Sequence, residues 1–520
     1  LAWLDGKKYP GEELTEDWKK VLFNQFHDLA AGSGIGVIYK DAQKDYDVVR
    51  WSTNEISAGA LATVAARVNT FGEGVPILVY NPLGWERSGE VDVKVQLPSA
   101  APFVVLDGPV RISFERGDLN PQTGIQELRL QVPSVPALGY KLLRVVTAAG
   151  DAAKPKSTLT STSTKAVSIE NASLRVTVDM YTGCMTSIFD KRAGFESIAA
   201  GACGNQLQFF KDTPKDYDAW NVDPGTLDVA PDTIAKPDLV ALTDVSPNHP
   251  SSSIRVTRTW QSSKFVQTIS LKGDQVDVEN DIDWHERHVL LKAAFPLAAT
   301  SDFATYEIPY GTIDRPTTRN NSWEKAQFEV PAMRWADLGD GKHGLSVLNQ
   351  DKYGYDAVGN MLRLSLLRGP TWPDPEADQG HHHFHYALYP HAGTWKHALT
   401  VRLGWEYDYP LTAVVTTAHA GSLPAEHSYA SVAPENVVLT AVKKAEDENG
   451  LIFRVYEWAG KSATAEFHVP AGATGATVTN LMETAEGGPL KVEGDVVKAP
   501  IHPYEILTIR VDYPKAGNRE

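Results

Sequence analysis

Residues 91–97 read VDVKVQL and alternate apolar with polar side chains at every position. Because successive side chains of a β-strand point to opposite faces, this alternation predicts a strand with one buried and one solvated face. The same pattern recurs along most of the chain, at residues 128–132, 174–178, 276–278, 362–366 and 465–469. Turn residues separate these short segments, which is typical of antiparallel β-sandwiches. The sequence therefore predicts a mainly β protein.

The first 70 residues follow a helical period instead. Apolar side chains have the i, i+3, i+4, i+8 spacing of an amphipathic helix at positions 18, 21, 22 and 26. Thr15 is the expected N-cap, and the helix is expected to end near residues 30–34, where two glycines permit a sharp turn. A second, alanine-rich periodic run covers residues 35–69. We therefore expect two helices joined by a glycine-rich turn, a helical hairpin.

Changes in pattern and composition mark the domain boundaries. The period changes from helical to alternating after residues 72–74, which read GEG. A polar, low-complexity stretch at residues 157–164 and a second polar stretch at residues 416–422 interrupt the strand-like segments. The expected domains are a helical segment at 1–72, a small β-sandwich at 73–155, a large β super-sandwich at 156–415 and a C-terminal β-sandwich at 416–520.

Composition excludes several classes of protein. Hydrophobic residues make up 42% of the 520 residues and charged residues 22%, which is typical of globular chains and not of disordered ones. No apolar run approaches the ~18 residues that a membrane helix needs. The chain has 65 acidic and 49 Lys and Arg residues, a net charge of −16, with no basic block. Such a surface does not attract nucleic acid or an anionic membrane.

The cysteines and the first residues bear on the compartment. Cys184 and Cys203 are too few for a disulfide framework, which favours a reducing compartment or no dependence on redox. The chain starts at Leu1 without the basic-then-apolar pattern of a signal peptide. We therefore expect a cytoplasmic location and a chain that lacks something N-terminal. The oligomeric state stays open, with a homo-oligomer among the alternatives.

Two polar clusters are candidates for chemistry. Residues 24–28 read NQFHD at the end of the first expected helix, beside the glycine-rich turn. Helix-end contacts are the simpler interpretation, because one histidine cannot hold a divalent metal without ligands from elsewhere. Residues 381–385 read HHHFH. On a strand, alternate histidines would share one face at ~6.6–7 Å spacing, which is long for chelating one ion and favours a sheet face or cleft lining.

Tryptophans give a weaker indication of carbohydrate binding. Several lie close to acids or arginines in the large β unit, namely Trp220, Trp284, Trp323, Trp335 and Trp372. Aromatic faces stack on the C–H faces of sugars while charged groups bind the hydroxyls. For any single tryptophan an ordinary sandwich core is the simpler interpretation. Taken together in an acidic, multi-sandwich chain, they make a carbohydrate-active protein the leading class.

Five ordered motifs resemble one known family. Residues 21–28, VLFNQFHD, followed by Gly-Ser-Gly at 32–34, resemble the signature of the glycoside hydrolase family 38 α-mannosidases. Further segments resemble the family in the right order, at residues 79–87, 183–191, 216–220 and 310–317. Residues 349–354 and 378–381 are most similar to its cytosolic or vacuolar branch. The resemblance covers essentially the whole chain and implies a partial helical middle domain followed by sandwiches, the largest of them galactose-mutarotase-like.

The resemblance also implies roles for individual residues. His27 matches one of four protein ligands to a divalent metal, usually zinc, with cobalt as an alternative. Asp28 matches a residue that helps to hold the sugar hydroxyls. The metal gathers the O2 and O3 hydroxyls of the mannose that is cleaved. An arginine from the β region lines the substrate site in some members, and Arg368, followed by Arg315, is the candidate here.

The chain departs from the family pattern in one large respect. Family members carry the nucleophilic Asp, the general acid and the other metal ligands in an N-terminal α/β domain, and no carboxylate pair here matches theirs. We therefore expect the C-terminal portion of a metal-dependent retaining α-mannosidase, which acts on mannose-containing glycans and is inactive without that domain. The alternatives are a non-catalytic carbohydrate-binding or scaffold module, and a lyase or phosphorylase built on a similar sandwich.

Overall fold

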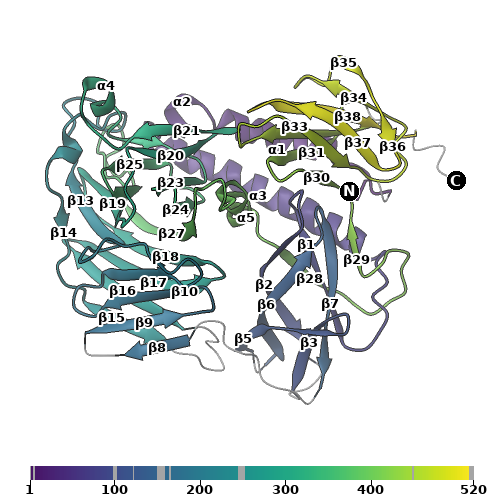
Figure 1. Cartoon of the computed structure of the whole chain (residues 1–520), viewed down its shortest axis with the longest axis horizontal. Coiled ribbons are helices and arrows are strands. Elements are labelled where there is room, and N and C mark those ends of the chain that lie inside the picture. The colour runs from purple at the N-terminus through teal and green to yellow at the C-terminus, as the bar shows by residue number, and fades with distance from the viewer. Residues whose placement is uncertain are drawn as a thin grey trace.

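The protein consists of a helical segment followed by three β units (Figure 1). The computed structural model describes residues 2–3, 6–97, 102–120, 122–148, 158–162, 165–243, 252–447 and 450–514. The predicted mainly β class is confirmed, with all strand pairs in the ladders antiparallel. The long helix α3 runs from the large sandwich to the small one, so the helical segment contacts both.

The predicted helical hairpin is present, with different ends. The helices are α1 (Gly11–Phe23), α2 (His27–Ala30) and α3 (Gly36–Ala65). The N-cap of α1 is Pro10, so the prediction of Thr15 as N-cap is wrong. Thr15 lies inside the first turns, where its hydroxyl donates to the Gly11 carbonyl. Proline tolerates this position because its missing N–H would have no helical partner.

The contact between α1 and α3 is polar. Asp17 of α1 and Asn24, the C-cap of α1, are buried. Asp17 accepts a hydrogen bond from Ser52, at 2.7 Å, and Asp45 of α3 accepts from both Lys20 and Asn24, at 2.8 and 3.2 Å. The opposite side of α1 and the following turn carries the apolar stripe, defined as Trp18, Leu22, Phe23 and Phe26, whose members are between 60% and 77% exposed.

The small sandwich contains the stretch VDVKVQL. Its two sheets have the strand orders β28-β1-β7-β3-β4, with β29 on β7, and β2-β6-β5. In β2 the side chains of Val91, Val93 and Val95 are buried and those between them are exposed, as the alternation predicts. The strands are β1 (Val75–Asn81), β2 (Arg87–Gln96), β3 (Phe103–Asp107), β4 (Val110–Ile112), β5 (Phe114–Leu119), β6 (Ile125–Val135), β7 (Gly139–Thr147), β28 (Thr412–Val415) and β29 (Glu426–Ser428).

The small sandwich is discontinuous in sequence. Strand β28 pairs with β1, and β29 pairs with β7, although both follow the large sandwich along the chain. The boundaries predicted at residues 155 and 415 place these two strands in other domains. Strands β28 and β29 can pair at these positions because β1 and β7 each have backbone groups there that no other described strand pairs with. The sequence between residues 157 and 164 is likewise not only a linker, since residues 158–162 form β8; residues 157, 163 and 164 lie outside the described residues.

The large sandwich holds the main hydrophobic core. Its sheets have the orders β12-β11-β10-β9-β8, β14-β13-β19-β26-β25-β22 and β15-β16-β17-β18-β27-β24-β23-β20-β21. One continuous cluster of buried side chains, including Phe265, Trp284 and Phe295, draws on all three.

The large sandwich contains twenty strands and three short helices among the described residues, with the following bounds. The strands of the first two sheets are β8 (Thr158–Thr162), β9 (Ala166–Glu170), β10 (Leu174–Asp179), β11 (Met185–Asp190), β12 (Phe195–Glu196), β13 (Gln206–Lys211), β14 (Asp232–Thr233), β19 (Val289–Pro296), β22 (Val330–Pro331), β25 (Gly354–Val358) and β26 (Met361–Leu367). Those of the third are β15 (Leu239–Thr243), β16 (Ser253–Trp260), β17 (Ser263–Lys272), β18 (Gln275–Trp284), β20 (Phe303–Ile308), β21 (Gly311–Pro316), β23 (Trp335–Gly339), β24 (His343–Asn349) and β27 (Gly380–Ala392). Short helices are η1 (Thr226–Asp228), α4 (Ser322–Lys325) and α5 (Thr400–Asp408).

The C-terminal sandwich packs on the other units through tryptophans. Its sheets are β30-β33-β37-β36 and β31-β32-β38-β34-β35. One buried cluster joins Trp85 of the small unit, Trp335 of the large unit and Trp458 of the C-terminal unit. The strands are β30 (Ser431–Ala433), β31 (Val437–Lys444), β32 (Gly450–Glu457), β33 (Ala463–His468), β34 (Gly475–Thr479), β35 (Ala485–Leu490), β36 (Val492–Glu493), β37 (Val496–Ile501) and β38 (Ile506–Asp512).

The pairing of the two cysteines differs from the expectation. Cys184 and Cys203 form a disulfide with a Cα–Cα distance of 4.9 Å. The chain brings them together because Met185 and Gly204, the residues after each cysteine, exchange backbone hydrogen bonds. The argument from cysteine usage to a reducing compartment therefore fails, and the cytoplasmic location stays a prediction.

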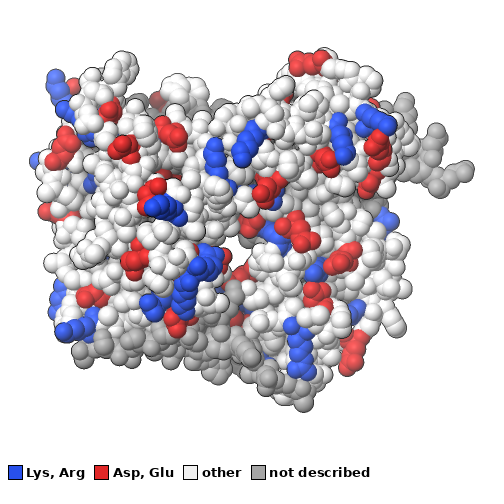
Figure 2. Space-filling view, in the orientation of Figure 1, with Lys and Arg blue, Asp and Glu red and all other residues white. Residues whose placement is uncertain are grey.

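Surface charge agrees with the composition. On the face shown in Figure 2, basic and acidic side chains are interspersed, and the surface is hollowed between the small and large sandwiches. Among the described residues, no helix is both long enough and apolar enough to cross a membrane.

Candidate functional site

The NQFHD segment spans the break between α1 and α2 and includes the first two residues of α2. A tight turn at residues 31–35 then leads into α3, and we call residues 27–36 the elbow. Gly32 has φ +78°, a left-handed conformation that favours glycine. A Cβ atom at Gly34 would lie 3.0 Å from the Asp28 carbonyl oxygen and closer still to Ile38, so this position also requires glycine. The Gly34 N–H donates to the Tyr39 hydroxyl at 2.8 Å. The glycines that were expected to end a helix thus fold the chain back to Asp28.

His27 and Asp28 project from the first turn of α2 into solvent. The side chain of His27 is 77% exposed and that of Asp28 45% exposed, and Nε2 of His27 lies 3.3 Å from Oδ2 of Asp28. The His27 ring packs against Phe26 with centroids 4.3 Å apart, which orients it. An exposed imidazole nitrogen beside a carboxylate supplies two donor atoms for a metal or a sugar hydroxyl. Both are therefore accessible and adjacent, although neither forms a closed site within the described residues.

A loop of the large sandwich touches this elbow. A Cβ atom at Gly36, the first residue of α3, would lie 2.8 Å from Oδ2 of Asp374. Partial burial raises the pKa of Tyr39, the Gly34 hydrogen bond opposes this rise, and the carboxylates of Asp374, Asp378 and Asp28 raise it further. The elbow and the loop around Asp374 therefore form one acidic surface. Sequence reasoning missed Tyr39 and Asp374, because no motif links positions so far apart.

Arg368 lies beneath the neighbouring loop at residues 212–221. Its guanidinium donates to the carboxylate of Asp212 and to the carbonyl oxygen of Asn221. Asp212 is buried, and burial raises its pKa while Arg368 opposes the rise. Arg368 thus holds both ends of the loop, and in this arrangement two of its nitrogens bind protein rather than a ligand.

Four of the five tryptophans singled out in the sequence separate into two groups, and the fifth, Trp323 on α4, is exposed. Trp284 and Trp335 are fully buried core residues, for which the simpler interpretation is correct. Trp220 and Trp372 are exposed and pack against each other and against Tyr217, at ring-centroid distances of 5.2 to 5.9 Å. We call Tyr217, Trp220 and Trp372 the aromatic trio. Motif 216–220 had indicated two of its members.

Arg315 and the histidine cluster occupy other surfaces. Arg315, on β21, lies over the Tyr306 ring at 4.8 Å and donates to the Pro331 carbonyl oxygen. The alternate histidines of β27 face carboxylates of β18, as expected for a strand. His383 pairs with Asp281 at 2.8 Å, and together with Glu279 these side chains form an exposed group of metal-type donors, the one such group found in the described part of the chain. It contains neither His27 nor Asp28.

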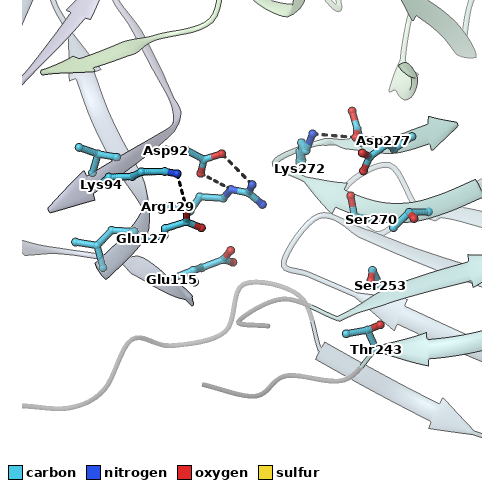
Figure 3. A pocket seen from close by; sticks show the side chains of 15 residues that line it. Asp92, Lys94, Glu115, Glu127, Arg129, Thr243, Ser253, Ser270, Lys272 and Asp277 are labelled. Atoms are coloured by element: carbon cyan, nitrogen blue, oxygen red, sulfur yellow. Dashed lines mark hydrogen bonds and ion pairs between the residues drawn. The ribbon is translucent and has the colours of Figure 1, made fainter. Parts of the chain in front are cut away.

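A cleft of about 540 Å³ separates the small and large sandwiches. Figure 3 shows ion pairs on both walls: Arg129 binds Asp92 and Lys94 binds Glu127 on one wall, and Lys272 binds Asp277 on the other. The lining also includes Glu115 and Glu279, so the cleft is polar and carries two more carboxylates than cations.

Comparisons with known proteins relate the chain to one enzyme family. The family model described as the alpha mannosidase middle domain matches residues 1–64, which include the elbow. The model of the glycosyl hydrolases family 38 C-terminal domain matches residues 169–376, and that of the family's C-terminal beta sandwich domain matches residues 436–509.

Relatives and solved structures agree with these matches. The chain is 32% identical to alpha-mannosidase 2C1 of Mus musculus over 96% of its own length and 46% of that protein, and 27% identical to an alpha-mannosidase of Saccharomyces cerevisiae over 90% and 40%. The chain spans about half the length of the curated relatives it matches. The crystal structure of an alpha-mannosidase from Enterococcus faecalis V583 shares the fold, with a TM-score of 0.80 at 18% identity over 98% of this chain and 64% of that one. With three domain matches in order, this chain belongs to glycoside hydrolase family 38.

Proposed function

We propose that the chain forms part of a metal-dependent retaining α-mannosidase that removes terminal α-D-mannosyl residues from oligosaccharides or glycoconjugates. The observation that carries this proposal is the elbow, in which His27 and Asp28 are exposed side by side within the family's middle-domain match. The names of the relatives support mannosides as the substrate class.

The donor set at the elbow fits one part of a metal site. A zinc ion takes four ligands drawn from His, Cys and carboxylates, and the exposed side chain of His27 offers one imidazole nitrogen. Asp28, 3.3 Å away, is placed either to bind the same ion or to orient the imidazole. Zinc, or cobalt in its place, would supply electrostatic stabilisation of the sugar hydroxyls. The remaining ligands are proposed to come from residues outside these 520.

The residues of this chain would hold the terminal mannose. An ionised Asp28 accepts hydrogen bonds from sugar hydroxyls, and such charge-assisted bonds are strong and directional. Its backbone is held in place, because Ser33 and Tyr39 both point their hydroxyls at the Asp28 carbonyl oxygen, at 3.5 Å. Retaining hydrolysis also needs a nucleophile and an acid about 5–5.5 Å apart. We propose that an N-terminal α/β domain supplies this pair.

The apolar stripe is the proposed docking face for that domain. Its four side chains end at Phe26, directly before His27. Exposed apolar side chains in a contiguous group mark surfaces that another protein covers. A domain docked on the stripe would therefore bring its own ligands next to His27.

Activity measurements test this proposal. We expect the 520-residue chain alone to leave an aryl α-mannoside intact, and the chain extended by the coding sequence that precedes it to hydrolyse the substrate until a chelator is added. His27→Ala in the extended protein should lower kcat/KM more than 100-fold, since even residues that only support a ligand are worth 10- to 100-fold. His383→Ala is the matched control, an exposed histidine beside a carboxylate, and should leave kcat/KM unchanged.

Two outcomes contradict the proposal. Chelator-sensitive hydrolysis by the chain alone would show that the nucleophile lies within these 520 residues. Full activity of the His27→Ala protein would remove His27 from the site. Absence of any coding sequence upstream would favour the second candidate, a non-catalytic carbohydrate-binding module, which the exposed aromatic trio supports.

A further inference from the structure

The aromatic trio is an exposed apolar surface of defined shape. Tyr217, Trp220 and Trp372 are 61%, 45% and 51% exposed, although each is large enough to bury extensively in a core. Their ring centroids lie 5.9, 5.4 and 5.2 Å apart in the three pairs, so the rings form one cluster rather than three isolated side chains. The two tryptophans come from segments 152 residues apart, which shows that the tertiary fold assembles the cluster.

A buried carboxylate holds the trio in place. Asp218 accepts hydrogen bonds from the backbone N–H groups of Thr371 and Trp372, at 2.7 and 3.1 Å, and thereby ties the two segments together. Burial raises the pKa of Asp218, but these hydrogen bonds outweigh it and the pKa is lowered, which keeps the carboxylate ionised. Tyr217 has φ +56°, an uncommon conformation for a residue with a side chain, which the surrounding contacts must maintain.

Because these contacts already order the aromatic trio, binding a ligand there costs less conformational entropy. A ligand that meets already ordered side chains loses less conformational entropy on binding than one that must order them. Arg368 adds a second tie, because it joins Asp212 at one end of the loop to Asn221 at the other. The trio is therefore preorganised as a platform.

The platform lies next to the elbow. Trp372 is two residues from Asp374, and consecutive Cα atoms are ~3.8 Å apart, so their Cα atoms are at most about 7.6 Å apart. The Asp374 carboxylate in turn reaches Gly36, at the start of α3. A ligand held at His27 and Asp28 and extending over Asp374 would meet the trio.

We propose that the aromatic trio binds a second sugar residue of the glycan whose terminal mannose is held at His27 and Asp28. This inference rests on the proposed function and names how that site would select extended glycans over monosaccharides. The C–H face of a hexose stacks on exposed aromatic rings, and exposed charged groups next to the rings, at Lys215 and Asp216, suit its hydroxyls. A protein partner is a poorer fit, because the charges that surround this small patch would lose their solvation.

Binding measurements on the 520-residue chain test the platform without catalysis. Isothermal titration should show that an α-linked mannotriose binds more tightly than methyl α-mannoside. Trp372→Ala and Trp220→Ala should each weaken mannotriose binding roughly three- to tenfold, whereas Trp372→Phe, which keeps a ring, should retain most of the affinity. Trp323→Ala is the matched control, since Trp323 is an exposed tryptophan on α4, and should bind like the parent chain.

The outcomes separate this inference from the proposed function. Unchanged mannotriose affinity in both alanine variants, an equal loss in Trp323→Ala, or no mannotriose binding by the chain would overturn the platform. These results would leave the His27 activity test untouched. Conversely, a fully active His27→Ala enzyme refutes the proposed function, and trio-dependent mannotriose binding would still support the platform. Thermal unfolding of each variant excludes misfolding, and Trp372→Phe keeps the test valid if the alanine variant unfolds.

Discussion

The helical segment and the β-sandwiches use their apolar residues in opposite ways. In β2 every second side chain is apolar and buried, and the large sandwich gathers such residues into one core. In α1 the buried side carries Asp17 and the apolar stripe faces solvent. A helix ordinarily turns its apolar face to a core. The sandwiches complete their cores within the chain, whereas the apolar face of the helical segment is not covered by any of the described side chains.

The largest expected effect comes from the sandwich core. Phe265 of β17 is fully buried and lies edge-on to Phe209 and Trp284, at centroid distances of 5.6 and 6.3 Å. Phe265→Ala should lower the free energy of unfolding by about 3–5 kcal/mol, because a cavity remains where the ring was. Urea unfolding followed by circular dichroism measures this. A loss below about 1 kcal/mol would mean that the sandwich core is much looser than its burial indicates.

A titratable group on α5, which packs on the large sandwich, gives an intermediate effect. Burial raises the pKa of Asp408, the last residue of α5, to about 6, although Arg334 at 3.2 Å opposes the rise. A carboxyl whose pKa is higher in the folded than in the unfolded protein stabilises the fold at low pH, and this stabilisation is lost as the pH rises from about 4 to 6. Asp408→Asn should remove the dependence, so the variant gains about 1–3 kcal/mol relative to the parent between pH 4 and pH 7.

Unfolding free energies of parent and variant at several pH values provide the measurement. Asp45 in the helical hairpin should behave in the opposite sense, because hydrogen bonds from Lys20 and Asn24 lower its pKa. The contribution of Asp45 is present at neutral pH and is lost as the pH falls below the usual range of a carboxylate. A gain of Asp408→Asn at low rather than high pH would contradict the assigned environment.

The smallest effect is expected on the apolar stripe. Phe23→Ser replaces a large side chain that is 77% exposed, so the free energy of unfolding of the chain should change by no more than about 0.5 kcal/mol. Phe265→Ala is the matched comparison, since the two changes remove the same ring from opposite environments. If Phe23→Ser destabilised the chain by several kcal/mol, the stripe would be covered in solution, and the contrast between the two regions would disappear.

Much of the fold could be predicted from the sequence, because its elements have clear periods. The strand that contains residues 91–96 and the helical hairpin are both present, although the first helix begins and ends earlier than its pattern indicates. The assignment of β28 and β29 to the small sandwich could not be predicted, since their pairing partners lie more than 280 residues away. The pairing of Cys184 with Cys203 was missed for a related reason: composition counts cysteines but does not place them.

The same distinction between local patterns and long-range contacts applies to the residues of the candidate site. His27 and Asp28 were named from a local motif, and the elbow that presents them depends on Gly32 and Gly34 within the next six residues. Arg368 was named from the resemblance, and its placement beneath the loop at residues 212–221 follows from contacts that no local pattern encodes. Whether it also reaches substrate in the complete site stays a prediction, as does the role of Arg315.

Local sequence patterns are sufficient to specify which segments are strands or helices, which side of each is apolar, and that glycines turn the chain after the NQFHD motif. These properties depend on residues within a few positions of one another, through the directions that strands and helices impose on their side chains. The tertiary fold, in contrast, specifies which apolar faces are covered, brings Trp220 against Trp372, and places Asp374 next to α3. Those contacts join segments far apart in the chain, and they depend on how the sandwiches pack rather than on any local period.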